Sequence, residues 1–234
     1  MPSLLDVVDS LLRGRFTKDE DLAGGRIEVP VRSLLLVAPL LGAGYGACMG
    51  LFALMRGGGD GALQLVASTT KVPLLFLLTL AVTFPSLYVS SALCDSRLAR
   101  GPTLRLLLVA VTVNLALLAS FGPVTAFFTV STTSYPFMVL LNTLVFAISG
   151  AAGLAFLARA LRGVFGAGAA PVAASHQPRR IFAIWLAIYA VVGAQMGWIM
   201  RPFIGSPGVA FTFFRARQSN FFQAIVHALA QLSR

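Results

Sequence analysis

The chain has 234 residues, of which 57% are hydrophobic and 11% charged, and its formal net charge is +10. Charged residues make up about a quarter of an average soluble domain, so this composition excludes an ordinary soluble protein. The excess of basic residues does not indicate nucleic-acid binding. No basic stretch is interleaved with aromatic residues, and the arginines instead flank apolar segments, where they meet lipid headgroups.

Residues 1–32 are predicted to form a cytoplasmic segment that carries an amphipathic helix. Apolar residues at positions 4, 8, 11 and 12 repeat at helical spacing, while Asp6, Asp9 and Arg13 lie on the other side. Such a helix lies either on the membrane surface or on another protein, and we favour the membrane surface.

Residues 33–200 are predicted to be a transmembrane domain of five helices. The apolar segments are residues 34–55, 72–93, 106–128, 137–157 and 181–200. A hydrocarbon core of about 30 Å needs about 20 helical residues, so each segment is long enough to cross it. No segment has an Asp, Glu, Lys, Arg or His in its interior. We therefore expect an all-α membrane protein without proton chemistry inside the bilayer.

The first span carries a ridge of small residues, Gly42, Gly46 and Gly50, spaced four apart. Such a GxxxGxxxG ridge lets another helix approach closely. The partner is either another span of the same chain, which we favour, or a second copy of the protein.

The second span is predicted to begin at residue 72, and a short surface helix at residues 63–70 is predicted to precede Lys71 and Pro73. Pro85 lies near its middle, with Thr83 and Ser86 beside it. A proline frees a backbone carbonyl that nearby hydroxyl groups can satisfy. This pattern predicts a kinked helix with a polar seam, which is either structural, as we favour, or lines a cavity.

Three polar side chains are predicted within later spans: Asn114, Asn142 and Gln195. A buried Asn in lipid usually bonds to a neighbouring helix, and Asn114 and Asn142 can pair if they lie at similar depth. A polar site for a transported solute is the alternative. The third span also contains a break at Gly122-Pro123.

Residues 201–234 are predicted to be an interfacial C-terminal segment. Trp198, Arg201 and Arg215 are expected to anchor the chain at headgroup level. The apolar residues 209–214 are too short to span, so they either dip into the interface or fold back against the bundle. After residue 220 an amphipathic helix is expected to lie flat on the membrane.

The basic residues predict the orientation. With five spans, the side of the N-terminus holds twelve Lys and Arg residues and the opposite side six. The positive-inside rule then places the N-terminus in the cytoplasm. The richness in Gly, Ala and Arg suggests a bacterium, so we expect a multi-pass protein of the bacterial cytoplasmic (inner) membrane.

Several of these stretches resemble a known group of proteins. Residues 72–79 (VPLLFLLT), 84–88 (FPSLY) and 193–205, with Arg215 and Asn220-Phe221-Phe222, are similar to a family of uncharacterised bacterial five-span membrane proteins. The resemblance implies the five-span plan and no activity. The plan also resembles Yip1-type trafficking proteins, although the Asp-Leu-Tyr-Gly-Pro motif of their eukaryotic members is absent.

We expect no enzyme and no catalytic, cofactor-binding or metal-binding residue, because the spans offer neither a nucleophile–base pair nor a metal-ligand set. The sequence favours a membrane subunit or scaffold that assembles with itself or with a partner membrane protein. The alternative is an oligomeric channel or facilitator for ions or small solutes, with Asn114 and Asn142 facing the pore.

Overall fold

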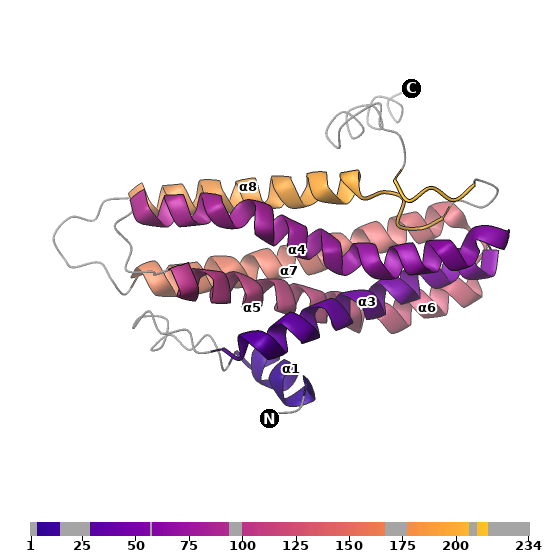
Figure 1. Cartoon of the computed structure of the whole chain (residues 1–234), viewed down its shortest axis with the longest axis horizontal. Coiled ribbons are helices and arrows are strands. Elements are labelled where there is room, and N and C mark those ends of the chain that lie inside the picture. The colour runs from indigo at the N-terminus through magenta and orange to yellow at the C-terminus, as the bar shows by residue number, and fades with distance from the viewer. Residues whose placement is uncertain are drawn as a thin grey trace, which may run out of the picture.

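The computed structural model describes residues 4–14, 29–56, 58–93, 100–166, 177–205 and 210–214. Every regular element in this part of the chain is helical, which confirms the all-α class. The elements are α1 (Leu4–Leu12), α3 (Val31–Arg56), the 3-10 turn η1 (Gly58–Asp60), α4 (Gly61–Leu93), α5 (Arg100–Ser120), α6 (Gly122–Ser131), α7 (Tyr135–Gly166) and α8 (Gln177–Ile199). The long helices lie roughly along one axis and form an elongated bundle (Figure 1).

Four stretches of the described residues have the length and hydropathy to cross a membrane: Val31–Arg56, Gly61–Val89, Thr103–Ser131 and Tyr135–Ala160. The outward surface of these helices agrees with lipid contact, since large apolar side chains such as Leu36, Val66, Phe127 and Leu140 are more than half exposed. The described apolar part of α8, Ala183–Ile199, is shorter. The architecture is that of a multi-pass membrane protein.

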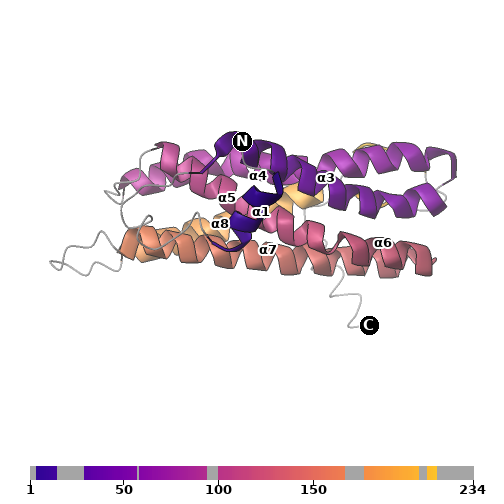
Figure 2. The ribbon, with the colours of Figure 1, turned by 90° about the horizontal axis from the view of Figure 1, so that it is seen from below.

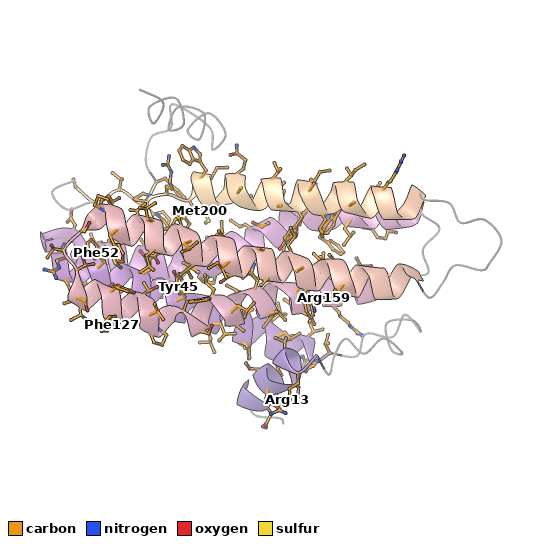
Figure 3. All side chains as sticks on the ribbon, turned by 180° about the vertical axis from the view of Figure 1, so that it is seen from behind. Arg13, Tyr45, Phe52, Phe127, Arg159 and Met200 are labelled. Carbon is orange, nitrogen blue, oxygen red and sulfur yellow. The ribbon has the colours of Figure 1, made fainter. Side chains whose placement is uncertain are left out.

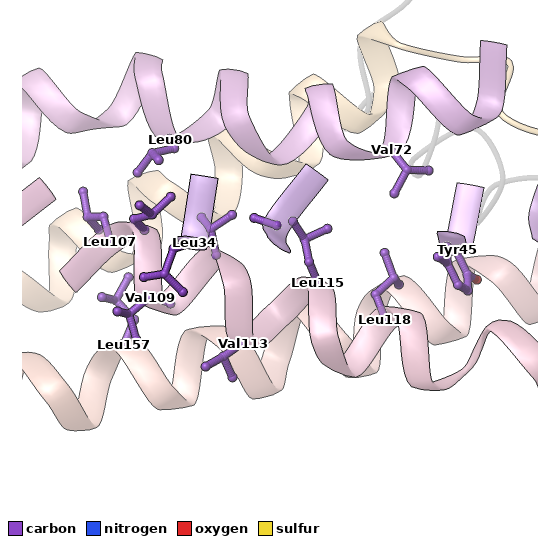
Figure 4. Close-up of a cluster of buried hydrophobic side chains, with 14 of the residues drawn as sticks. Leu34, Tyr45, Val72, Leu80, Leu107, Val109, Val113, Leu115, Leu118 and Leu157 are labelled. Carbon is purple, nitrogen blue, oxygen red and sulfur yellow. The ribbon is translucent and has the colours of Figure 1, made fainter. Parts of the chain in front are cut away.

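The centre of the bundle is built on α3, which packs against α4, α5 and α6, while α7 closes over α5 and α8 lies along α4. Figure 4 shows the buried side chains from these helices meeting in one cluster, among them Leu34, Val72, Leu107 and Leu115. Close packing of this kind holds helices together in lipid, where no hydrophobic driving force acts between them.

α1 lies across one face of the bundle, against α3 and α5 (Figure 2). Val7 and Leu11 are each 2% exposed and belong to the central cluster, whereas Asp6 and Asp9 face outward. Arg13 forms an exposed ion pair with Asp9, which raises the pKa of its guanidinium. The apolar side that the sequence directs to lipid or to another protein is thus packed against this chain's own helices.

One helix boundary differs from the sequence prediction, and one predicted break, at Gly122-Pro123, is confirmed. α4 begins at Gly61 and continues through Pro73 and Pro85, so residues 63–70 belong to a long helix and form no separate surface helix. The predicted third span is divided at Phe121 into α5 and α6, with Pro123 in the first turn of α6. A proline is tolerated there because the first turn of a helix has no internal acceptor for its N–H groups.

Candidate functional site

Lys71 is the most unusual residue of the described chain, because its side chain is 0% exposed within α4. The same helix presents Leu63, Val66, Leu74 and Val82 outward, on both sides of Lys71 along the axis. The lysine therefore points inward from a helix whose outer face is apolar. The expectation that all charges lie outside the spans is wrong here, because the helix extends eleven residues further toward its N-terminus than predicted.

The packing of α4 on α3 shows how deep Lys71 lies. A Cβ atom built on Gly42 would come 3.0 Å from Pro73, and one built on Gly46 would come 2.9 Å from the Cα of Thr69. The backbone of Lys71 is therefore level with the middle of α3. Arg32 and Arg56 bound α3, each about 18 Å away along the axis. The Lys71 backbone lies near the centre of the apolar layer.

The ammonium group of Lys71 is held by backbone carbonyls and aromatic rings. Nζ donates a hydrogen bond to the carbonyl oxygen of Pro202 at 2.9 Å and another to that of Phe213. It also lies 4.6 Å from the ring centroid of Phe213 and 5.5 Å from that of Phe214, which is cation–π distance. These partners are neutral, so no counter-charge among them balances the ammonium.

Two further side chains of α4 join this site. Gln64 Nε2 donates to the carbonyl oxygens of Phe203 at 2.9 Å and Pro202 at 3.3 Å. The Ser68 hydroxyl lies within hydrogen-bond distance of the carbonyl oxygens of Phe203 and Gln64. Because Gln64, Ser68 and Lys71 are spaced by four and three residues, they form one stripe on the helix. We call them the α4 donor stripe.

The shared acceptor also locates the ammonium. Since Lys71 and Gln64 both donate to the Pro202 carbonyl, the lysine side chain reaches back along α4 toward Gln64 and the Asp60 end of the bundle. Side chains of helical residues point toward the helix N-terminus, which favours this direction. The charge thus lies inside the apolar layer but on the side of Asp60.

The carbonyls of Pro202 and Phe203 belong to residues 200–205, which we call the unwound segment. α8 ends at Ile199, about midway along the bundle, and Met200 marks the change to non-helical chain (Figures 1 and 3). Ile204 is 6% exposed, and the ring of Phe203 packs 5.9 Å from that of Phe146 on α7. Non-helical backbone is tolerated at membrane depth only when protein or a water-filled cavity surrounds it.

The returning chain closes the site. The backbone N–H of Phe211 donates to Asp60 Oδ2 at 2.9 Å, and Phe213 accepts from Lys71. Residues 210–214 therefore fold back against the bundle, which was one of the two alternatives that the sequence left open. The donor stripe and these carbonyls together form a site rich in hydrogen-bond donors and acceptors.

A second polar group lies between α3, α6 and α7. The hydroxyl of Tyr45 donates to Asn142 Oδ1 at 2.7 Å, Asn142 Nδ2 donates to the carbonyl of Met138, and Thr125 lies 3.5 Å from the Tyr45 oxygen. Asn114 instead contacts Gly153, eleven residues further along α7 than Asn142. That separation is about 16 Å, so the two asparagines do not pair.

The other residues singled out in the sequence lie elsewhere. Gln195 and Trp198 are half-buried on α8, and the guanidinium of Arg201 lies 3.2 Å from the centroid of the Trp198 ring. Arg215 and the predicted C-terminal helix lie outside the described residues. The anchoring role of Trp198, Arg201 and Arg215 stays a prediction.

Sequence reasoning missed the donor stripe. Its signal was present, because Gln64, Ser68 and Lys71 recur at helical spacing and an apolar run follows. In the described part of the chain, no three His, Cys, Asp or Glu side chains come together as metal ligands. Comparison with protein-family models, with curated proteins and with solved structures found no match to this chain.

Proposed function

We propose that this protein is a facilitator that binds a small polar solute inside the membrane and lets it pass. The observation that supports the proposal is the buried Lys71, held by unwound backbone within the apolar layer. A charge in this position is costly, and ionisable residues within spans usually mark solute or ion pathways. Transporters commonly bind their substrates where a broken helix exposes backbone groups.

Two features that favoured assembly with a partner are used for contacts within this chain. The glycine ridge of α3 faces α4, where Gly46 lies against the backbone of Ser68 and Thr69. The apolar side of α1 faces α3 and α5. The features that favoured a partner surface in the sequence are therefore occupied by the protein itself, which shifts the balance toward solute handling.

The facilitator proposal is tested by swelling of proteoliposomes. Purified protein is placed in phosphatidylcholine vesicles, and entry of urea, glycerol or lactate is followed by light scattering. We expect faster entry of at least one solute than in empty vesicles, and slower entry with Lys71→Met. Thr70→Val is the matched control, since Thr70 is the exposed neighbour on the same helix. Silent vesicles with correctly folded protein would refute the proposal.

Assembly remains the second candidate, and one observation favours it. Ala151 and Ala155 lie one turn apart on the exposed side of α7, and a Cβ on the adjacent Gly150 would meet no atom within 4 Å. Small residues on an outer helix face permit close approach of another helix. Chemical crosslinking in membranes tests this: wild type should give a discrete larger species that Ala151→Leu removes, and unchanged crosslinking of the variant would contradict it.

We also propose five crossings of a bacterial inner membrane, with the N-terminus in the cytoplasm. α8 and the unwound segment together make the fifth passage, since Phe211 reaches Asp60 at the far end of α4. Because Lys71 lies inside α4, the outer side retains five basic residues against twelve. Reporter fusions after residues 57 and 97 should be active outside and inside, respectively, and the reverse pattern would contradict this topology.

A further inference from the structure

The donor stripe of α4 offers many hydrogen-bond donors, and among the described residues its acceptors are neutral carbonyl oxygens. Lys71 contributes three N–H donors and Gln64 contributes two, and Ser68 adds a hydroxyl. All three reach carbonyl oxygens of the chain that follows α8. Each acceptor is neutral, so none of these partners supplies a negative charge to the Lys71 ammonium, whose side chain is 0% exposed.

We propose that this site, if the proposed function holds, takes a small oxyanion such as a carboxylate or a phosphate. Two oxygens of the anion would replace the Pro202 and Phe203 carbonyls on Lys71, Gln64 and Ser68. An anion adds charge–charge attraction to the ammonium, which a neutral carbonyl does not supply, and it makes the bonds from Gln64 and Ser68 charge-assisted, so the exchange is favourable. The negative charge would also balance the buried ammonium, which the carbonyls leave uncompensated.

Binding in this way requires the unwound segment to leave the donor stripe. Gly205 packs so closely that a Cβ built there would lie 3.0 Å from Gln64 Cγ and 3.2 Å from Ala53 Cβ. The segment is held to α4 by side-chain donors and not by a helix or sheet of its own. It therefore acts as a gate on the Asp60 side, and an anion that binds the donors favours the open state.

A lysine that merely fastens the unwound segment to the bundle is the competing explanation. Both roles predict that Lys71 affects stability. Only the anion site predicts that a negatively charged ligand protects the protein and that protection depends on the lysine charge. The test therefore measures ligand protection and does not rely on stability alone.

The first experiment is thermal unfolding of the full chain in a neutral detergent. Lactate is compared with its neutral isostere lactamide, at constant ionic strength. We expect lactate, but not lactamide, to raise the unfolding midpoint of wild type and of Thr70→Val. Lys71→Met should weaken the apparent affinity for lactate about tenfold or more. Equal protection by lactamide, or unchanged protection of Lys71→Met, would overturn the proposal.

Two additions keep this test decisive. Lys71→Arg retains the charge, so it should retain protection by lactate even if Lys71→Met does not fold, and loss of protection in a folded Lys71→Arg would count against a charge-based site. A phosphate group can also come from a lipid, so free phosphate is compared with phosphatidylglycerol in the micelles. Protection by the lipid alone would identify the oxyanion as a headgroup.

The second experiment locks the gate with a disulfide. The Ala53–Gly205 separation lies close to the usual Cβ–Cβ range of about 3.5–4.5 Å, so Ala53→Cys and Gly205→Cys should form a bond in a background where Cys48 and Cys94 are replaced by alanine. Oxidation should abolish protection by lactate, and reduction should restore it. Protection that is unaffected by the crosslink would refute the gate.

The two proposals fail separately. If lactate raises the unfolding midpoint through Lys71 but the vesicles show no solute entry, the anion site is supported and the facilitator proposal is refuted. Entry of urea or glycerol without any protection by lactate or phosphate would sustain the facilitator and overturn the anion site.

Discussion

Replacing Gly46 by alanine should destabilise the protein by forcing α3 away from α4. The new Cβ would lie 2.9 Å from the Cα of Thr69 and from the carbonyl carbon of Ser68, and closer still to the Ser68 oxygen. These are backbone atoms, so no side-chain rotation can relieve the clash. Real Cβ atoms essentially never lie closer than 3.0 Å to such atoms, and ordinary contact begins at 3.4 Å, so the helices must separate by about half an ångström.

The magnitude follows from two opposing effects. Overpacking of a tight interface costs about 1–3 kcal/mol, whereas alanine in place of glycine gains up to about 1 kcal/mol of helix propensity. A gap of 0.5–1 Å forfeits about a quarter to a half of each dispersion contact along the seam. Gly42 and Gly50 also pack tightly on α4, since Cβ atoms built on them would lie 3.0 Å and 2.8 Å from its backbone, so separation at Gly46 loosens contacts along the whole seam. Because helix propensity offsets up to about 1 kcal/mol of the packing cost, we expect a net loss of about 1–2 kcal/mol.

The assay is reversible unfolding in mixed micelles by increasing dodecyl sulfate, followed by circular dichroism. Gly44→Ala is the matched control, because a Cβ at Gly44 meets no atom within 4 Å. It should be neutral or slightly stabilising, by up to about 1 kcal/mol. Equal stability of Gly46→Ala and Gly44→Ala would refute the packing argument. A stable Gly46→Ala that changes only its oligomeric state would show instead that the ridge faces a second copy.

Three further substitutions test other contacts. Tyr45→Phe should cost about 1–2 kcal/mol in the same unfolding assay, because it leaves the buried Asn142 oxygen without its donor; no loss would contradict the hydrogen bond. Asn114→Leu should be neutral or stabilising, since the buried Asn114 Oδ1 has no hydrogen-bond partner, and a loss above about 2 kcal/mol would show a partner. Leu11→Ser should release α1, seen as faster proteolysis of the N-terminal segment, whereas Asp9→Ala at the exposed ion pair should leave the proteolysis rate unchanged.

Much of the architecture could be predicted from local pattern. Runs of about 20 apolar residues located four membrane helices, because hydrocarbon thickness imposes that length whatever the neighbouring helices are. The boundaries were less predictable. The start of the second span was placed after Lys71, because a charged residue is normally read as an interfacial one. In the structure, Lys71 continues α4, since the carbonyl of Pro202 satisfies its ammonium.

The candidate site depended on contacts between distant parts of the chain. Gln64 and Lys71 meet residues more than 130 positions away, at the end of α8. A buried polar side chain destabilises the protein unless it finds a hydrogen-bond partner. A local sequence pattern does not reveal which distant residues supply that partner. The same limit explains the asparagines: both were predicted within spans, but only packing decides that Asn142 meets Tyr45 and that Asn114 meets Gly153.

The sequence alone indicates that this protein folds in a lipid bilayer. Its segments have the length and apolarity of membrane-spanning helices. A helix can cross hydrocarbon at low free-energy cost because its backbone N–H and C=O groups are hydrogen-bonded to each other. Which polar groups lie inside the bundle depends on how the helices pack in three dimensions. The glycine ridge brings α4 close to α3, and the unwound segment supplies the acceptors that make a buried Lys71 tolerable. The energetic cost of a charge in lipid depends on the groups that bind it, and three-dimensional packing brings those groups together.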